Sequence, residues 1–142
     1  MKDEIVGKYV RDMEELKREV ESYKQRFSIP EEEGWELPIY HESVIFYFSI
    51  IYKYLVFENI PIFSGGKGLD AWIEHKGDVI DMEFEVLSSN LLQPRHHTDE
   101  AIEKCKLLVC WRDNSRKKQD CWKHIDVFEL RDFWERKKTK NP

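Results

Sequence analysis

Apolar residues near the start of the chain recur at alternating steps of three and four. Between residues 5 and 27 these positions are Val6, Tyr9, Met13, Leu16, Val20, Tyr23 and Phe27. This heptad spacing predicts an amphipathic helix with one narrow apolar stripe. Two interpretations stay open: a coiled-coil seam that makes a homodimer, or a helix docked on its own core. We therefore divide the chain into an N-terminal helical element, 1–30, and a main domain, 38–142.

The densest apolar region extends from His41 to Phe57 and contains no Gly, Pro or Asn. It is rich in aromatic and β-branched residues, so its periodicity does not distinguish a helix from a strand. Its length of about 17 residues exceeds a typical strand and predicts a buried helix. A Gly-rich turn follows at 64–68, without the spacing of a phosphate-binding P-loop.

The clearest strand prediction is Val79 to Leu87, where apolar and polar residues alternate. Its even-numbered positions are apolar, whereas Asp81, Glu83 and Glu85 occupy odd-numbered ones. This pattern predicts one face on the core and one lined by carboxylates. The other expected elements are strands near 69–75, 106–111 and 125–130 and helices near 98–104 and 132–138. The order predicts an α/β fold with a mixed sheet flanked by helices.

Charge is distributed unevenly along the chain. The 142 residues carry a net charge of −5, but residues 104–142 alone carry +6. A polyanion would therefore meet the C-terminal third of the protein. Within it, a basic loop after the predicted central strand contains Arg112, Arg116, Lys117 and Lys118. Such a loop is either a solvated surface or a contact for nucleic-acid phosphates.

Cysteine usage and hydropathy indicate where the protein works. Three cysteines, Cys105, Cys110 and Cys121, fit a reducing compartment, and their spacing does not match a zinc finger. No apolar stretch reaches the ~20 residues that a membrane span needs. We therefore expect a cytoplasmic protein with no membrane partner. A hydrophobic content of 41% excludes disorder of the whole chain.

Three carboxylates are expected to meet across the predicted hairpin: Asp70 on one strand, and Glu83 and Glu85 on the next. Two carboxylates at 4 Å repel by about 1 kcal/mol in water and about 4 kcal/mol at an effective dielectric constant of 20. Bound Mg²⁺ or Mn²⁺ removes this repulsion, takes carboxylate ligands and supports phosphodiester hydrolysis. The pattern predicts Asp70 and Glu83 as metal ligands. The alternative is an ordinary charged strand face.

The stretch from His41 to about Asn114 resembles the PD-(D/E)XK nuclease superfamily, which has the restriction-endonuclease-like fold. Asp70 matches the acid of the second strand in that family, Glu83 matches the acid of the third, and Glu85 stands where Lys is usual. The segments "DMEFEVLSSNLLQPRHH" and "CKLLVCW" are similar to a poorly characterised prokaryotic group assigned to that fold.

The resemblance implies a Mg²⁺- or Mn²⁺-dependent endonuclease that acts on DNA. It makes Glu85 a ligand or general base and Glu42, at the start of the buried helix, an additional acid. It also implies that His96 or His97 contacts the substrate. Because Glu85 replaces the usual Lys, a second reading stays open. It is a catalytically inactive nuclease-fold module that binds nucleic acid or a protein partner and dimerises through residues 5–27.

Overall fold

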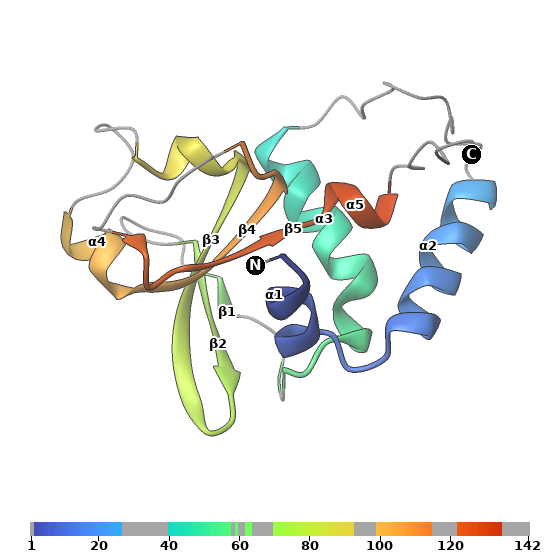
Figure 1. Ribbon diagram of the computed structural model, residues 1–142, viewed down its shortest axis with the longest axis horizontal. Helices are drawn as coiled ribbons and strands as arrows, with labels where there is room; N and C mark the ends of the chain where they lie inside the picture. The colour runs from blue at the N-terminus through green and yellow to red at the C-terminus, as the bar shows by residue number, and fades with distance from the viewer. Residues whose placement is uncertain are drawn as a thin grey trace.

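The computed structural model describes residues 2–26, 40–57, 59, 62–63, 70–92, 99–114 and 122–134. Its helices are α1 (Lys2–Tyr9), α2 (Met13–Arg26), α3 (His41–Ile51), α4 (Asp99–Lys104) and α5 (Arg131–Trp134), with 3₁₀ turns η1 (Tyr52–Tyr54) and η2 (Ser88–Leu92). Its strands are β1 (Ile62–Phe63), β2 (Ala71–His75), β3 (Asp78–Leu87), β4 (Cys105–Arg112) and β5 (Asp126–Glu129). Figure 1 shows their arrangement. The predicted α/β class is confirmed.

The sheet is mixed and open, with strand order β1-β2-β3-β4-β5. The first three strands form an antiparallel meander, whereas β4 and β5 both run parallel to the strand before them. A parallel neighbour requires a crossover, and α4 lies in the connection between β3 and β4. The hairpin, helix and following strand have the order expected from the sequence, whereas β1 was not predicted.

The β2–β3 hairpin closes through a two-residue turn at Lys76 and Gly77. Both residues have left-handed backbone conformations, with φ of 53° and 82°. Two consecutive positive φ values match the twist of paired strands, which is why such turns favour Gly. The Lys76-Gly77-Asp78 sequence is typical of a turn, and the turn sets the register that pairs His75 with Asp78.

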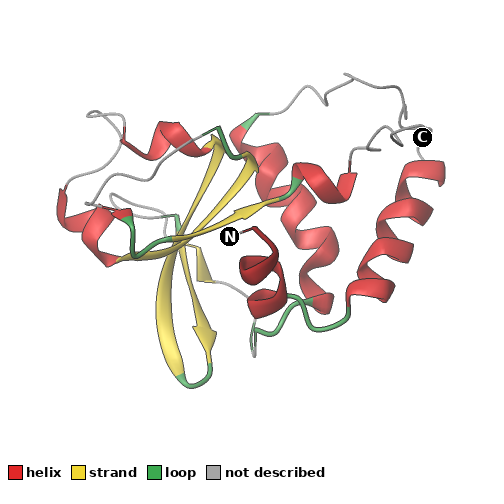
Figure 2. Cartoon of the chain, viewed as in Figure 1, coloured by secondary structure: helices red, strands yellow, loops and turns green. Residues whose placement is uncertain are grey.

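Side chains cover both faces of the sheet, and Figure 2 shows helices on either side of it. On one face, Met82 and Phe84 of β3 pack with Val44 and Phe48 of α3. On the other face, a second buried cluster contains Leu91, Ile102, Cys105, Leu108, Cys110, Trp122, Ile125 and Val127. Because β4 contributes to both clusters, the prediction of a central strand covered on both faces is confirmed.

The structure divides the single helix predicted over 5–27 into α1 and α2. Asp12 caps α2: its Oδ1 accepts the Glu15 N–H at 3.1 Å. The backbone just before it pairs with the end of the long apolar segment, through a bridge between Val10 and Leu55 and a 2.7 Å bond from the Arg11 N–H to the Tyr54 carbonyl. This long-range pairing interrupts the helix without disturbing the heptad spacing.

The apolar stripe itself packs inside the chain. Tyr9, Leu16 and Val20 belong to the main core. Further along α2, the Tyr23 ring meets the Trp134 ring of α5 edge-on at 5.5 Å. These contacts favour the docked helix over the coiled-coil seam, and they give no support to a homodimer through residues 5–27. No helix of the described part of the chain is long and apolar enough to cross a membrane.

Candidate functional site

The site begins where β2 and β3 separate. Their pairing starts at Ala71 and Met82, so Asp70 lies just outside the ladder. Side-chain bonds continue it: the Phe84 N–H donates to Asp70 Oδ2 at 2.9 Å, and the Asp70 N–H donates to Glu83 Oε1 at 3.0 Å. These reciprocal bonds fix both carboxyl groups to the opposite backbone. The predicted approach of Asp70 to Glu83 is present in the structure.

Glu83 and Glu85 are buried, with exposed fractions of 2% and 8%. They point to the face of β3 opposite its core residues, because neighbouring side chains of a strand alternate between faces. Buried carboxyl groups require hydrogen bonds or opposite charge around them. An ordinary solvated strand face therefore does not describe these two residues.

His41 completes the cluster from the first turn of α3. Its Nε2 lies 3.0 Å from Asp70 Oδ2. Burial lowers the pKa of His41, but the hydrogen bond and charge of Asp70 raise it above its ordinary value overall. The charges of Glu85 and Glu42 add to this increase. A partly exposed imidazole that favours its protonated form therefore adjoins the carboxyl groups.

Several opposing influences act on the Asp70 carboxyl. Burial raises its pKa, whereas hydrogen bonds with the Glu83 carboxyl and the Phe84 N–H lower it. The hydrogen bond and charge of His41 act in the same direction, so the pKa of Asp70 lies below its ordinary value. Asp70 is thus held as an anion at neutral pH.

The negative potential of this region extends to the buried thiol of Cys105. Burial raises the pKa of Cys105 to about 12, with further increases from the charges of Glu83, Asp81 and Asp70. A thiol in this state is neutral and a poor nucleophile or metal ligand. Cys105 therefore belongs to the core, as does Cys110, which is also buried.

The predicted residues fall into three groups. Asp70 and Glu83 are in contact, and Glu85 and Glu42 lie near enough to His41 to affect its charge. Glu42 is exposed on α3, and Arg112 is exposed at the end of β4. The other predicted nucleic-acid contacts lie outside the described residues: His96, His97, Arg116, Lys117 and Lys118.

His41 was not predicted as a site residue, although it directly precedes Glu42. A polar network at the carboxyl ends of β3 and β4 was not predicted either. Ser88, which is fully buried, donates from Oγ to Asp113 Oδ1 at 2.7 Å, and Asn114 Nδ2 donates to Ser89 Oγ at 2.9 Å. The network ties together the two strand ends next to the carboxylates. The paired serines were visible in the sequence, but their partners lie 25 residues away.

The described residues contain no group of three or more His, Cys, Asp or Glu side chains that could hold a metal ion. They do contain the Asp70–Glu83 pair, joined by the hydrogen bond from the Asp70 N–H to Glu83 Oε1. Mg²⁺ needs only one or two protein carboxylates when water and substrate phosphates complete its shell. Asp70 and Glu83 can supply these two carboxylates, but they cannot supply a complete set of protein ligands.

No protein-family model, no curated protein and no solved structure matches this chain.

Proposed function

We propose that the protein is a Mg²⁺- or Mn²⁺-dependent nuclease that hydrolyses phosphodiester bonds, namely an endonuclease acting on DNA. One observation carries this proposal: two carboxyl groups, Asp70 and Glu83, are fixed in contact by backbone hydrogen bonds in a largely buried setting. A divalent cation would remove their mutual repulsion. The resemblance of the Glu-x-Glu strand to the PD-(D/E)XK superfamily supports the same chemistry.

Each residue would have a distinct part. Asp70 and Glu83 would hold the ion, and Glu85 would act as a ligand or as a general base. When bound, the ion would supply Lewis acidity and a nucleophile from water. His41 would orient Asp70 through its 3.0 Å contact, as outer-shell partners of metal ligands do. Glu42 would be an additional acid at the entrance, since it is exposed in the same helical turn.

The charge distribution supports a polyanionic substrate. Residues 104–142 carry a net charge of +6, and Arg112 is exposed at the end of β4. Phosphate contacts of this kind position a nucleic acid without reading its sequence. His96, His97, Arg116, Lys117 and Lys118 stay predicted contacts. A cytoplasmic location remains part of this proposal.

A cleavage assay tests the proposal. Duplex, single-stranded and branched DNA, and RNA, would each be incubated with Mg²⁺, Mn²⁺ or EDTA. Metal-dependent cleavage that Glu83→Gln and Asp70→Asn abolish would support the nuclease. Both substitutions keep the shape of the side chain, and Glu103→Gln, an exposed carboxylate on α4, is the matched control. Cleavage that survives in both site variants would contradict the proposal.

A second function, an inactive nuclease-fold module that binds nucleic acid or a protein, is favoured by Glu85. This carboxylate stands where the resembled family has Lys, and it cannot stabilise developing negative charge as an ammonium does. Salt-sensitive DNA binding without cleavage, together with no metal-dependent rise in melting temperature, would favour the module. The absence of both nucleic-acid binding and cleavage would reject both functions.

A further inference from the structure

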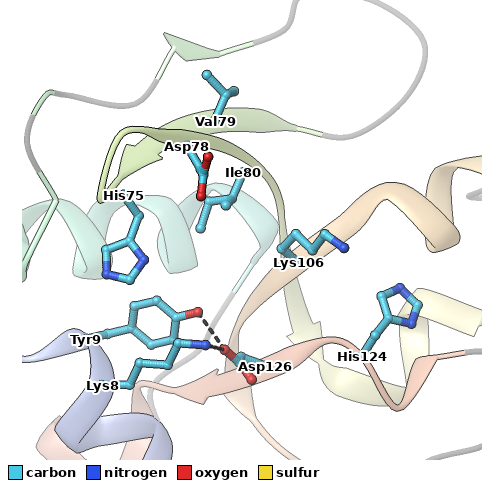
Figure 3. Close-up of a pocket in the computed structure, with 9 residues that line it drawn as sticks. All are labelled: Lys8, Tyr9, His75, Asp78, Val79, Ile80, Lys106, His124 and Asp126. Carbon is cyan, nitrogen blue, oxygen red and sulfur yellow. Dashed lines mark hydrogen bonds and ion pairs between the residues drawn. The ribbon is translucent and has the colours of Figure 1, made fainter.

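A polar cavity lies at the hairpin end of β3, away from Glu83 and Glu85 and on the same side of the sheet as α1. It has a volume of about 420 Å³, within the range of small-molecule sites. It forms because the β2–β3 hairpin extends past the rest of the sheet: pairing of β3 with β4 begins only at Asp81 and Cys105. The free end of the hairpin therefore overhangs α1 and β5 (Figure 3).

One side of this cavity is already neutralised. Asp126 accepts hydrogen bonds from Lys8 Nζ at 2.7 Å and from the Tyr9 hydroxyl at 2.6 Å. The Ile102 carbonyl lies 3.0 Å from His124 Nε2, so this nitrogen carries the proton that it donates. Lys8, Tyr9, His124 and Asp126 form the floor of the cavity. Their polar groups are bonded within the protein, so the floor offers no unpaired charge to a ligand.

Two opposite charges remain. Figure 3 shows the Asp78 carboxylate on the hairpin side of the cavity and Lys106 on the β4 side. Neither side chain forms an ion pair or hydrogen bond with any residue that the structure describes. Val79 and Ile80 add apolar atoms to the lining of the cavity. The cavity is thus polarised, negative at one wall and positive at another.

We propose that this cavity binds a small zwitterion that presents an anionic group to Lys106 and an ammonium group to Asp78. A ligand of one charge sign would satisfy one wall and be repelled by the other. A compact zwitterion satisfies both, and its charges are already separated by a short covalent chain. A free α-amino acid and an amino-alkyl phosphate share this chemistry.

The test is a titration of the full chain followed by ¹H–¹⁵N NMR and calorimetry. The probes are a set of α-amino acids and phosphoethanolamine; acetate, ethylamine and inorganic phosphate are the singly functional controls. We expect the amide signals of Val79 and Ile80 to shift with zwitterions only. The two kinds of zwitterion distinguish carboxylate from phosphate as the anionic group.

Variants make the assignment specific. Lys106→Met and Asp78→Asn should each weaken binding roughly 10- to 100-fold, because each loses one charge-assisted contact. Lys17→Met on α2 and Glu103→Gln on α4 change exposed charges elsewhere and should leave affinity unchanged. All four positions are exposed, so each variant is expected to fold. Its melting temperature checks this.

Three outcomes would overturn the proposal. They are no signal shift with any zwitterion up to about 10 mM, equal binding of acetate or phosphate with no effect of Asp78→Asn, and zwitterion binding that neither pocket variant weakens. Nuclease activity does not depend on these residues in the function proposed above, so the two proposals fail independently.

Discussion

The two ends of β3 place their carboxylates in different environments. Near the hairpin, the Asp78 carboxylate faces an open cavity and forms no ion pair or hydrogen bond with a described residue, whereas Glu83 and Glu85 in the second half of the strand are buried. The difference follows from the neighbours of the strand. The first three residues of β3 pair only with β2, whereas Asp81 and Met82 pair with both neighbours and the later residues pair with β4. One strand thus provides a rigid, enclosed site and an accessible one.

The largest expected effect comes from removing a core side chain under the enclosed end. Phe84 is fully buried and meets Phe48 of α3 edge-on at 5.4 Å. Phe84→Ala should lower the free energy of unfolding by about 3–5 kcal/mol, measured by urea denaturation. Val79→Ala, at a position 62% exposed on the same strand, should change it by less than about 0.5 kcal/mol. Similar losses of unfolding free energy for the two variants would contradict the difference in burial between the two ends of β3.

A smaller effect is expected at the turn that creates the overhang. Gly77 has φ of 82°, so Gly77→Ala places a Cβ in the left-handed region and should cost about 1–2 kcal/mol. Gly7 lies in helix α1 with open space around it, and Gly7→Ala should instead stabilise by about 0.5–1 kcal/mol. Thermal denaturation of both variants tests the sign. A stabilising Gly77→Ala would mean that the turn is not in this conformation.

The floor of the cavity should contribute about 1 kcal/mol through the Tyr9 hydroxyl, which Tyr9→Phe removes. Burial, the hydrogen bond to Asp126 and its charge all raise the pKa of Tyr9 above its usual range. Unfolded Tyr9 ionises first as pH increases, so this contribution is complete below about pH 10 and declines above it. The stability difference between wild type and Tyr9→Phe should therefore shrink as the pH increases above about 10. A difference that stays constant would contradict the assignment.

The smallest effect is expected for the Lys8–Asp126 ion pair, because Lys8 is half exposed. Lys8→Met should cost about 0.2–1 kcal/mol and less at high salt. Chemical denaturation at low and high ionic strength measures it. A loss larger than that of Tyr9→Phe would reverse the ranking of the two bonds on Asp126.

Local patterns predicted local structure well. The alternation along β3 and the Lys76–Gly77 turn depend on neighbouring residues, and both appear as expected. Contacts between distant segments were less accessible. The break between α1 and α2 depends on the pairing of Val10 with Leu55, and no feature of the heptad spacing signals it.

The candidate site shows the same division. The contact of Asp70 with Glu83 followed from hairpin register, which the sequence pattern predicts. His41 was missed because its contact with Asp70 spans 29 positions and depends on how α3 packs over the sheet. The burial of Glu83 was missed because a charged residue in an alternating strand is normally exposed.

The bond between Tyr9 and Asp126 joins residues 117 positions apart, and it has a consequence for the growing polypeptide. At about 5–20 residues per second, a ribosome needs roughly 6–23 seconds to add the residues between them. During that interval the apolar stripe of the first two helices has no β5 or α5 to contact. The N-terminal segment, although made first, completes its packing among the last. A nascent chain stalled before residue 122 should therefore bind chaperones that recognise exposed apolar helices.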